Sequence, residues 1–238
     1  MTADHSLLNS WATAHTALLV DGQARLSDIV GTSTPDWDLN LTTGMVSVGG
    51  TRLQCAFLGW VSEDNKWTWA WADPSVDSEA LGVHRGLPLK KFGQETGLWE
   101  FTEPTFSIEG IVDLGMTPGA TIAMVASPQI MGSAIFSAPK DGSRHYLVIT
   151  DPLLTLEAPS AFTTPKVLTS ALAYGLGNHR DIVTVYAAAY QLQVEQVGDT
   201  IILGFDDGSH LDVVFDETGQ LSDMQGRLPA DLMSRPSE

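Results

Sequence analysis

The eight residues Trp67-Thr68-Trp69-Ala70-Trp71-Ala72-Asp73-Pro74 constrain the fold more than any other stretch of the chain. Successive side chains on a β-strand point to opposite faces, so the three tryptophans would share one face and the small residues the other. Burial of each indole removes roughly 150–250 Å² from water and contributes on the order of 4–6 kcal/mol, as an upper bound. Asp73-Pro74 ends the run because proline cannot donate to a strand ladder. We therefore predict a core strand; the alternative is an exposed aromatic platform for a sugar or planar ligand.

The charge of the chain limits its partners. It has 29 acidic and 12 basic residues in 238, a formal net charge of −17. Such a surface repels nucleic-acid backbones and anionic membranes, and we expect neither as a partner. It suits a basic protein partner. The single cysteine, Cys55, excludes an intrachain disulfide, and no apolar run approaches the ~20 residues of a membrane span, so we expect a cytoplasmic protein without a signal peptide.

Hydrophobic periodicity predicts an α+β protein: an antiparallel, tryptophan-rich sheet with packed helices after an N-terminal helical arm. The arm covers residues 4–30, with Gly22 as a candidate break. Segment 182–192 fits a helix, although Val183 and Val185 also suit a strand. The other expected elements are strands over 36–60, 132–138 and 145–150, helices over 88–95, 119–125 and 164–175, and a hairpin over 200–215.

An internal repeat organises this pattern. The stretch from Phe57 to Asp73-Pro74 matches the stretch from Ile135 to Asp151-Pro152 without a gap, at an offset of 78 residues. Both stretches continue toward a helix that starts at a proline, which predicts a duplicated β-hairpin–helix unit. The corresponding ranges are an arm (1–35), a first repeat (36–117), a second repeat with an extra hairpin (118–224) and a flexible tail (225–238), within one globular body.

Few residues point to chemistry. The chain lacks a phosphate-binding glycine motif, a nucleophile elbow and a His-Glu-x-x-His zinc motif, so we predict no catalytic residue, no cofactor and no metal ion. His145 and His210 flank hairpin turns, and Asp73 and Asp151 are related by the repeat; these four are the candidate ligand-binding residues. The alternatives are exposed turn histidines and aspartates that form strand-end turns.

The tryptophan strand carries a family resemblance. Phe57-Leu-Gly-Trp60, followed by Trp67-x-Trp69-Ala70-Trp71-Ala72-Asp73-Pro74-Ser75, resembles the signature of an uncharacterised bacterial family, mainly actinobacterial, with Asp73 where the family has Asn. The resemblance implies a domain of unknown function and a bacterial cytosolic origin. It implies no reaction, cofactor or catalytic residue.

Three classes of function are open. The leading prediction is a non-enzymatic cytosolic interaction or regulatory protein, immunity-like or chaperone-like, whose acidic surface binds a basic partner. The alternative is a small-ligand-binding protein that uses an aromatic cleft. The third is a hydrolase with an Asp73–Asp151 or His–Asp site. The oligomeric state stays open.

Overall fold

A computed structural model describes residues 3–31, 36–113, 117–154, 158–174 and 177–229. The chain divides into a first unit, Met1–Ala12 with Asp21–Leu156, and a second unit, Thr13–Val20 with Glu157–Glu238. The first helix contributes to both units. The four ranges expected from the repeat follow sequence similarity rather than packing, and they stay a prediction.

The N-terminal arm is one helix, α1 (Ser6–Val30). Gly22 does not break it. A Cβ atom at Gly22 would lie 1.5 Å from the carbonyl oxygen of Ser133, so the glycine lets the chain before β6 approach the helix backbone. The close approach of the Ser133 backbone to the helix, rather than a break in the helix, explains why this position is a glycine.

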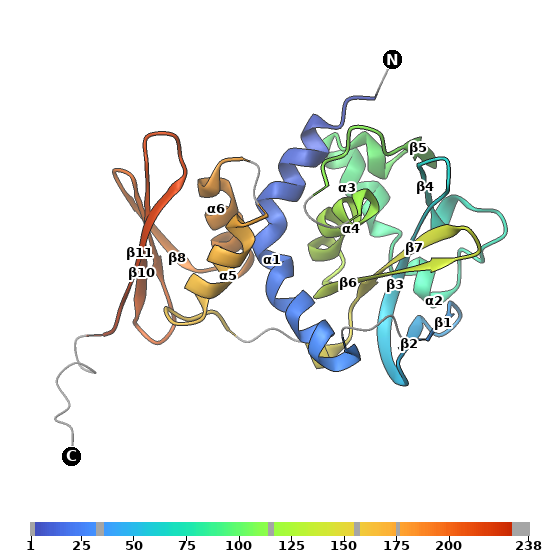
Figure 1. The fold of residues 1–238 in the computed structure, drawn as a ribbon, viewed down its shortest axis with the longest axis horizontal. Coiled ribbons are helices and arrows are strands. Elements are labelled where there is room, and N and C mark those ends of the chain that lie inside the picture. Colours follow the sequence, from blue (N-terminus) through green and yellow to red (C-terminus); the bar gives the residue numbers. More distant parts are fainter. Residues whose placement is uncertain (1–2, 32–35, 114–116, 155–157, 175–176, 230–238) are drawn as a thin grey trace. The chain divides into compact units, whose positions relative to one another are not determined.

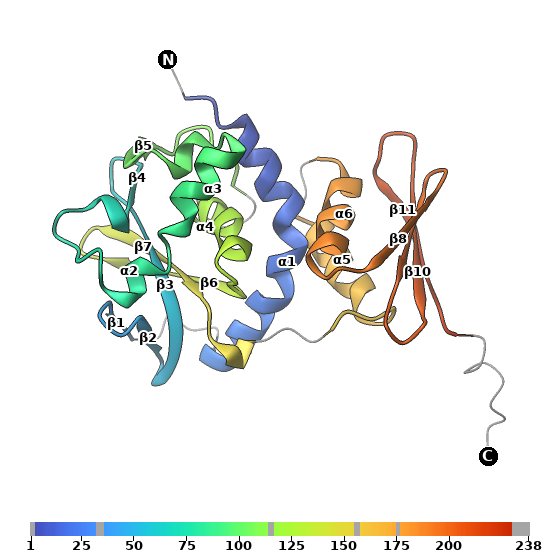
Figure 2. The same cartoon turned by 180° about the vertical axis from the view of Figure 1, so that it is seen from behind.

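The first unit is built on antiparallel strand pairs. Strands β1 to β5 follow one another in the order β1-β2-β3-β4-β5, and β7 pairs with both β3 and β6. Helix α4 packs on β6 and β7, and helix α2 packs on β3 (Figures 1 and 2). The strands of this unit are β1 (Trp37–Asn40), β2 (Met45–Val48), β3 (Thr51–Val61), β4 (Lys66–Trp69), β5 (Thr105–Ser107), β6 (Ala134–Lys140) and β7 (Ser143–Ile149). Its other helices are α2 (Leu81–His84), α3 (Pro88–Thr96), α4 (Pro118–Gln129) and the short 3₁₀ turns η1 (Ala70–Ala72), η2 (Trp99–Phe101) and η3 (Pro152–Leu154).

The tryptophan stretch lies in this core, with one correction. Trp67 and Trp69 are 0% and 1% exposed, so the core prediction holds for both. Strand β4 ends at Trp69, however, and Trp71 lies in η1 and is partly exposed. The Trp69 indole nitrogen donates to the Glu100 carbonyl at 2.7 Å. Three alternating tryptophans therefore do not form one strand face, because the chain turns after the second.

The two hairpins matched by the repeat both exist. Strands β3 and β4 form one, β6 and β7 form the other, and β3 pairs with β7 between them. Their registers differ by one residue, because Val61 pairs with Trp67 whereas Pro139 pairs with Arg144. The gapless alignment therefore equates Trp67 with His145, although Trp67 packs against Tyr146 and so lies on the other face of the sheet from His145.

The second unit is a four-stranded antiparallel sheet in the order β11-β10-β9-β8. Helices α5 and α6 cover one face of it, where Ile182 and Tyr186 pack with Leu203, Leu211 and Val213 (Figure 1). Residues 179–189 are helical, and the Asn178 side chain caps this helix by accepting from the Arg180 amide. Residues 225–227, predicted to begin a flexible tail, pair with β10; residues 230–238 lie outside the described residues. The elements are α5 (Thr164–Leu172), α6 (His179–Ala189), β8 (Gln193–Val197), β9 (Thr200–Gly204), β10 (His210–Phe215) and β11 (Leu221–Arg227).

Candidate functional site

The two predicted aspartates both form turns, Asp73 directly after η1 and Asp151 shortly after β7. Asp73 Oδ1 accepts from the Ser75 amide at 2.7 Å. Asp151 is buried; its Oδ2 accepts from the Gln54 amide at 2.8 Å and its Oδ1 from the Leu153 amide at 2.9 Å. Both carboxylates thus accept hydrogen bonds from backbone amides. A role for them in ligand binding stays a prediction.

His145 lies in a cluster of rings that we call the aromatic patch. Its imidazole centroid is 5.3 Å from Phe57, 6.0 Å from Trp37 and 6.0 Å from Trp60, and Phe136 lies 5.8 Å from Trp37. Phe57 is buried, whereas the other four side chains are partly exposed. Strands β1, β3, β6 and β7 each supply a ring, so the patch spans positions far apart in the chain.

A β-bulge in β3 assembles this patch. The pairing of β3 with β7 shifts between Phe57 and Gly59. Residues three apart on a regular strand face opposite sides, and the bulge returns Trp60 to the side of Phe57, where the two rings stack at 6.1 Å. Gly59 has φ 155°, and a Cβ atom there would lie 2.0 Å from the Thr68 carbonyl oxygen. Only glycine fits this position.

The electrostatics of the patch disfavour the protonated form of its histidine. Burial and nearby Lys140 lower the pKa of His145 below its ordinary value, and Asp141 partly opposes them. The Lys140 ammonium also lies 5.7 Å over the Trp37 ring. His145 Nδ1 is buried and has no hydrogen-bond partner among the described residues. The patch can therefore stack a planar or apolar group on its partly exposed rings.

A hollow of about 600 Å³ lies where the β3–β4 loop faces the β6–β7 turn. Glu63, Lys140 and Arg144 bring charges of both signs to its lining. The Tyr146 hydroxyl, also in the lining, is 2.6 Å from Thr117 Oγ1. Sequence reasoning missed Arg144 and Tyr146, since nothing local distinguishes them from other hairpin residues.

His210 belongs to the second unit, whereas Asp73, His145 and Asp151 belong to the first. It lines a hollow of about 480 Å³ on the outer face of the four-stranded sheet, with Glu195, Asp212 and Arg227. Among the described residues, no group of three or more His, Cys, Asp or Glu side chains is placed to hold a metal ion. In the same part of the chain, no helix is both long and apolar enough to cross a membrane.

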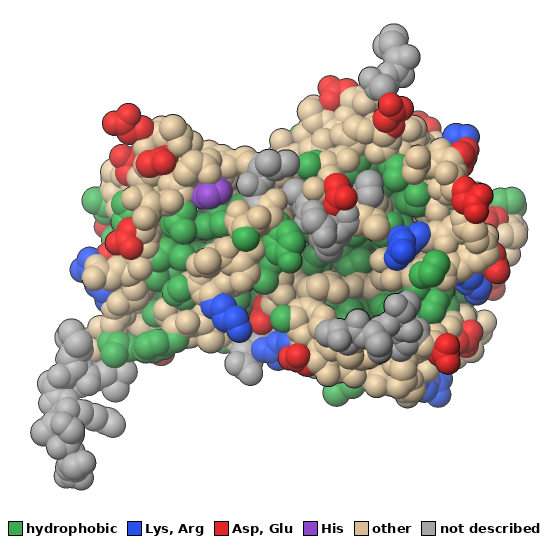
Figure 3. All heavy atoms as spheres, viewed as in Figure 1, with side chains coloured by type: hydrophobic (Ala, Val, Ile, Leu, Met, Phe, Trp, Pro, Cys, Tyr) green, Lys and Arg blue, Asp and Glu red, His purple; other side chains and the backbone are tan. Residues whose placement is uncertain are grey.

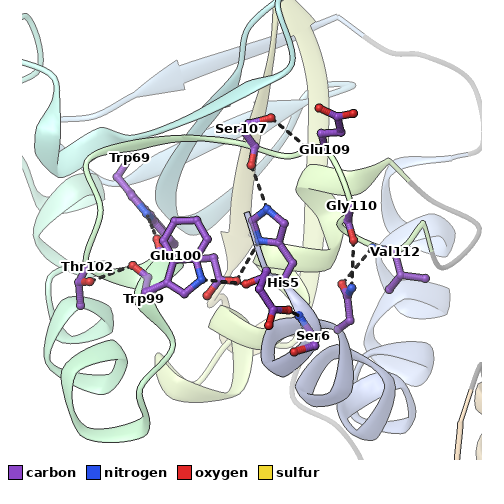
Figure 4. A network of polar contacts seen from close by, with 12 residues as sticks. His5, Ser6, Trp69, Trp99, Glu100, Thr102, Ser107, Glu109, Gly110 and Val112 are labelled. Atoms are coloured by element: carbon purple, nitrogen blue, oxygen red, sulfur yellow. Dashed lines mark hydrogen bonds and ion pairs between the residues drawn. The ribbon is translucent and has the colours of Figure 1, made fainter. Parts of the chain in front are cut away.

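A buried polar cluster ties the start of α1 to the first unit. His5 points from the N-terminal arm toward Glu100 in η2 (Figure 4), with Nδ1 2.9 Å from Oε1. Its Nε2 lies 3.1 Å from the Ser107 carbonyl oxygen, and Trp99 stacks on its ring at 5.2 Å. The side chains of His5 and Glu100 are almost fully buried. Sequence analysis did not single out this pair, because its members are 95 residues apart.

The fold and the aromatic patch define an α+β protein with antiparallel sheets and a partly exposed cluster of aromatic rings. Residues 9–152 match a family of unknown function, DUF6882, and the chain belongs to this family. The expectation of a domain of unknown function is confirmed. No curated protein and no solved structure matches the chain. The match includes the whole aromatic patch, and it ends before the helices and sheet of the second unit.

Proposed function

We propose that this is a non-enzymatic interaction or regulatory protein of the bacterial cytoplasm, immunity-like or chaperone-like, whose acidic surface binds a basic protein partner. The observation that carries the proposal is the distribution of charge. In residues 13–20 and 158–229 of the second unit, nine Asp and Glu residues accompany only Lys166, Arg180 and Arg227. Arg180 pairs with Asp199, and Arg227 pairs with Asp212. Carboxylates therefore outnumber basic side chains in this part of the second unit.

Such a surface favours a partner of opposite charge. Acidic side chains are spread over the face of the molecule seen in Figure 3. Complementary charge steers association and fixes orientation, and its effect weakens with salt because the Debye length falls to about 8 Å at physiological ionic strength. Binding of the partner is expected to be faster and tighter at low salt.

The test is affinity purification on the immobilised full chain at low and moderate salt, with identification of retained proteins. We expect a basic protein that is retained by the wild type and released by salt. The matched variant Glu195→Gln/Glu217→Gln/Asp223→Asn removes three exposed carboxylates of the second unit and should retain less of it. Recovery of no specific partner at either salt concentration counts against the proposal.

Small-ligand binding is a second candidate, because the aromatic patch presents partly exposed rings on which a planar group could stack. Saturation-transfer NMR with a library of planar and sugar compounds tests it. Trp60→Ala should remove the signal of any specific ligand, and Phe162→Ala, an exposed aromatic of the second unit, should not. A ligand retained by Trp60→Ala would place binding elsewhere. The turn contacts of Asp73 and Asp151 add no support to the hydrolase alternative.

We also infer that hairpins β3–β4 and β6–β7 derive from one duplicated unit. The gapless spacing of Asp73-Pro74 and Asp151-Pro152 supports this origin, and so does the adjacent pairing of the two hairpins through β3 and β7. The one-residue register difference then reflects divergence at the turn. The helices expected in the two repeats, α3 and α5, belong to different units.

A further inference from the structure

The sheet of the second unit has an unusual edge strand, β8. Strand β8 lies at the edge of the sheet and pairs on one side with β9, from Gln193–Gly204 to Val197–Thr200. All five of its residues are exposed, with Val194 at 53% and Val197 at 55%. Natural sheets protect such edges with lysines, prolines, bulges or a covering segment. The strand Gln-Val-Glu-Gln-Val contains no lysine or proline, and its pairing with β9 has no register shift.

The opposite edge of the same sheet has one of these protections, a bulge, and a proline follows its last strand. Strand β11 pairs with β10 through a register shift between Val214 and Phe215. It ends at Arg227, and Pro229 follows two residues later. The contrast within one sheet indicates that β8 is kept open for pairing.

The register shows which backbone groups of β8 point away from β9. In a hairpin closed by a two-residue turn, here Gly198-Asp199, the flanking residues form a hydrogen-bonded pair, and such pairs then alternate along the ladder. Gln193, Glu195 and Val197 therefore direct their N–H and C=O groups toward β9. Val194 and Gln196 direct theirs outward, where an added strand could use them.

We propose that β8 is the docking edge for an extended segment of the basic partner, which joins the sheet as a fifth strand. This inference rests on the proposed function and names its contact site. Charge complementarity selects this occupant, because Glu195 lies on one face of β8 in a unit whose charged residues are mostly carboxylates. A lysine or arginine of the added strand would lie beside Glu195, and an apolar residue on the opposite face would lie beside Val194. Alternating basic and apolar residues define the segment, as in strand-addition complexes.

The test uses the full chain and a fluorescent peptide of alternating lysine and valine, with binding followed by anisotropy. Gln196→Pro removes an outward N–H while sparing the bonds to β9, and Gln196→Ala keeps that N–H. We expect the proline variant to weaken binding at least about tenfold, the scale of one or two lost backbone hydrogen bonds, and the alanine variant to bind like the wild type. The Glu195→Lys variant should bind a glutamate–valine peptide more tightly than the lysine–valine peptide, the reverse of the wild type. Circular dichroism checks that each variant is folded.

Several results would overturn the docking edge. One is a lysine–valine peptide that does not bind, or that binds Gln196→Pro as well as the wild type. Another is that a peptide of the same composition, with its lysines and valines in separate blocks, binds as tightly as the alternating peptide. That result would show that charge alone accounts for the binding. Self-association of the wild type that Gln196→Pro abolishes would assign the edge to a second copy. In each case a basic partner found by affinity purification would leave the proposed function standing, whereas loss of that partner as well would remove both.

Discussion

The hydrogen bond between His5 Nδ1 and Glu100 Oε1, 2.9 Å long and fully buried, holds one shared proton. The Ser107 carbonyl can only accept, so His5 Nε2 must donate to it. Nδ1 and Oε1 then need one proton between them, either on an imidazolium facing a carboxylate or on a carboxylic acid facing a neutral ring. Glu100 Oε2 is buried with no hydrogen-bond partner among the described residues, which makes this pair sensitive to loss of either member.

We expect His5→Leu to destabilise the first unit by about 3–5 kcal/mol, since it leaves Glu100 buried without its partner. Glu100→Leu should have a similar cost, and the double variant should cost clearly less than the sum of the two. Urea unfolding followed by tryptophan fluorescence reports on this unit, because all seven tryptophans belong to it. Additive losses would show that the two side chains do not act as a pair.

Gly22→Ala should destabilise the protein, although alanine favours an isolated helix by up to about 1 kcal/mol. The added Cβ would lie 1.5 Å from the Ser133 carbonyl oxygen, and the backbone shift needed to relieve that contact should cost about 1–3 kcal/mol. Ala24→Gly, at an exposed position of the same helix, is the control, with an expected loss of about 1 kcal/mol. A stabilising Gly22→Ala would contradict the close approach of helix and strand.

Cys55 should be inert to thiol reagents while the protein is folded. Its side chain is 0% exposed, and burial raises the pKa of the thiol to about 12, although Arg85 acts in the opposite direction. The reactive thiolate is therefore scarce at neutral pH. Labelling with a chromogenic disulfide reagent should be complete in denaturant and negligible in native buffer. Rapid native labelling at one equivalent would show that the strand opens at Cys55.

The stability of the first unit should fall as the pH drops below about 6.5, the ordinary pKa of histidine. The folded state lowers the pKa of His145, chiefly through burial, so the unfolded chain binds the proton more readily. This contribution is complete above the unfolded pKa and is lost as the pH falls toward the folded value. Urea midpoints at mildly acidic and mildly alkaline pH, compared between wild type and His145→Phe, measure it. The variant should show a weaker pH dependence, and an unchanged one would rule out His145 as its source.

Sequence reasoning found most regular elements because their periodicity is local. The helix after Pro88 ends at Gly97, whose left-handed conformation caps it, and the hairpin of β9 and β10 follows the alternation of residues 200–215. Strands β8 and β11 were missed. Strand β8 has no buried face, so no alternation marks it, and most of β11 is also exposed.

The amino-acid sequence by itself determined the α+β class, the buried positions of Trp67 and Trp69, the acidic surplus and the membership of a family of unknown function. Tertiary structure alone decided the aromatic patch, the pairing of His5 with Glu100 and the open edge at β8. The reason is physical. Periodicity encodes which face of an element is apolar, whereas a bulge at Gly59, a one-residue difference in hairpin register and the partner of a residue 95 positions away depend on contacts that form only when distant segments pack.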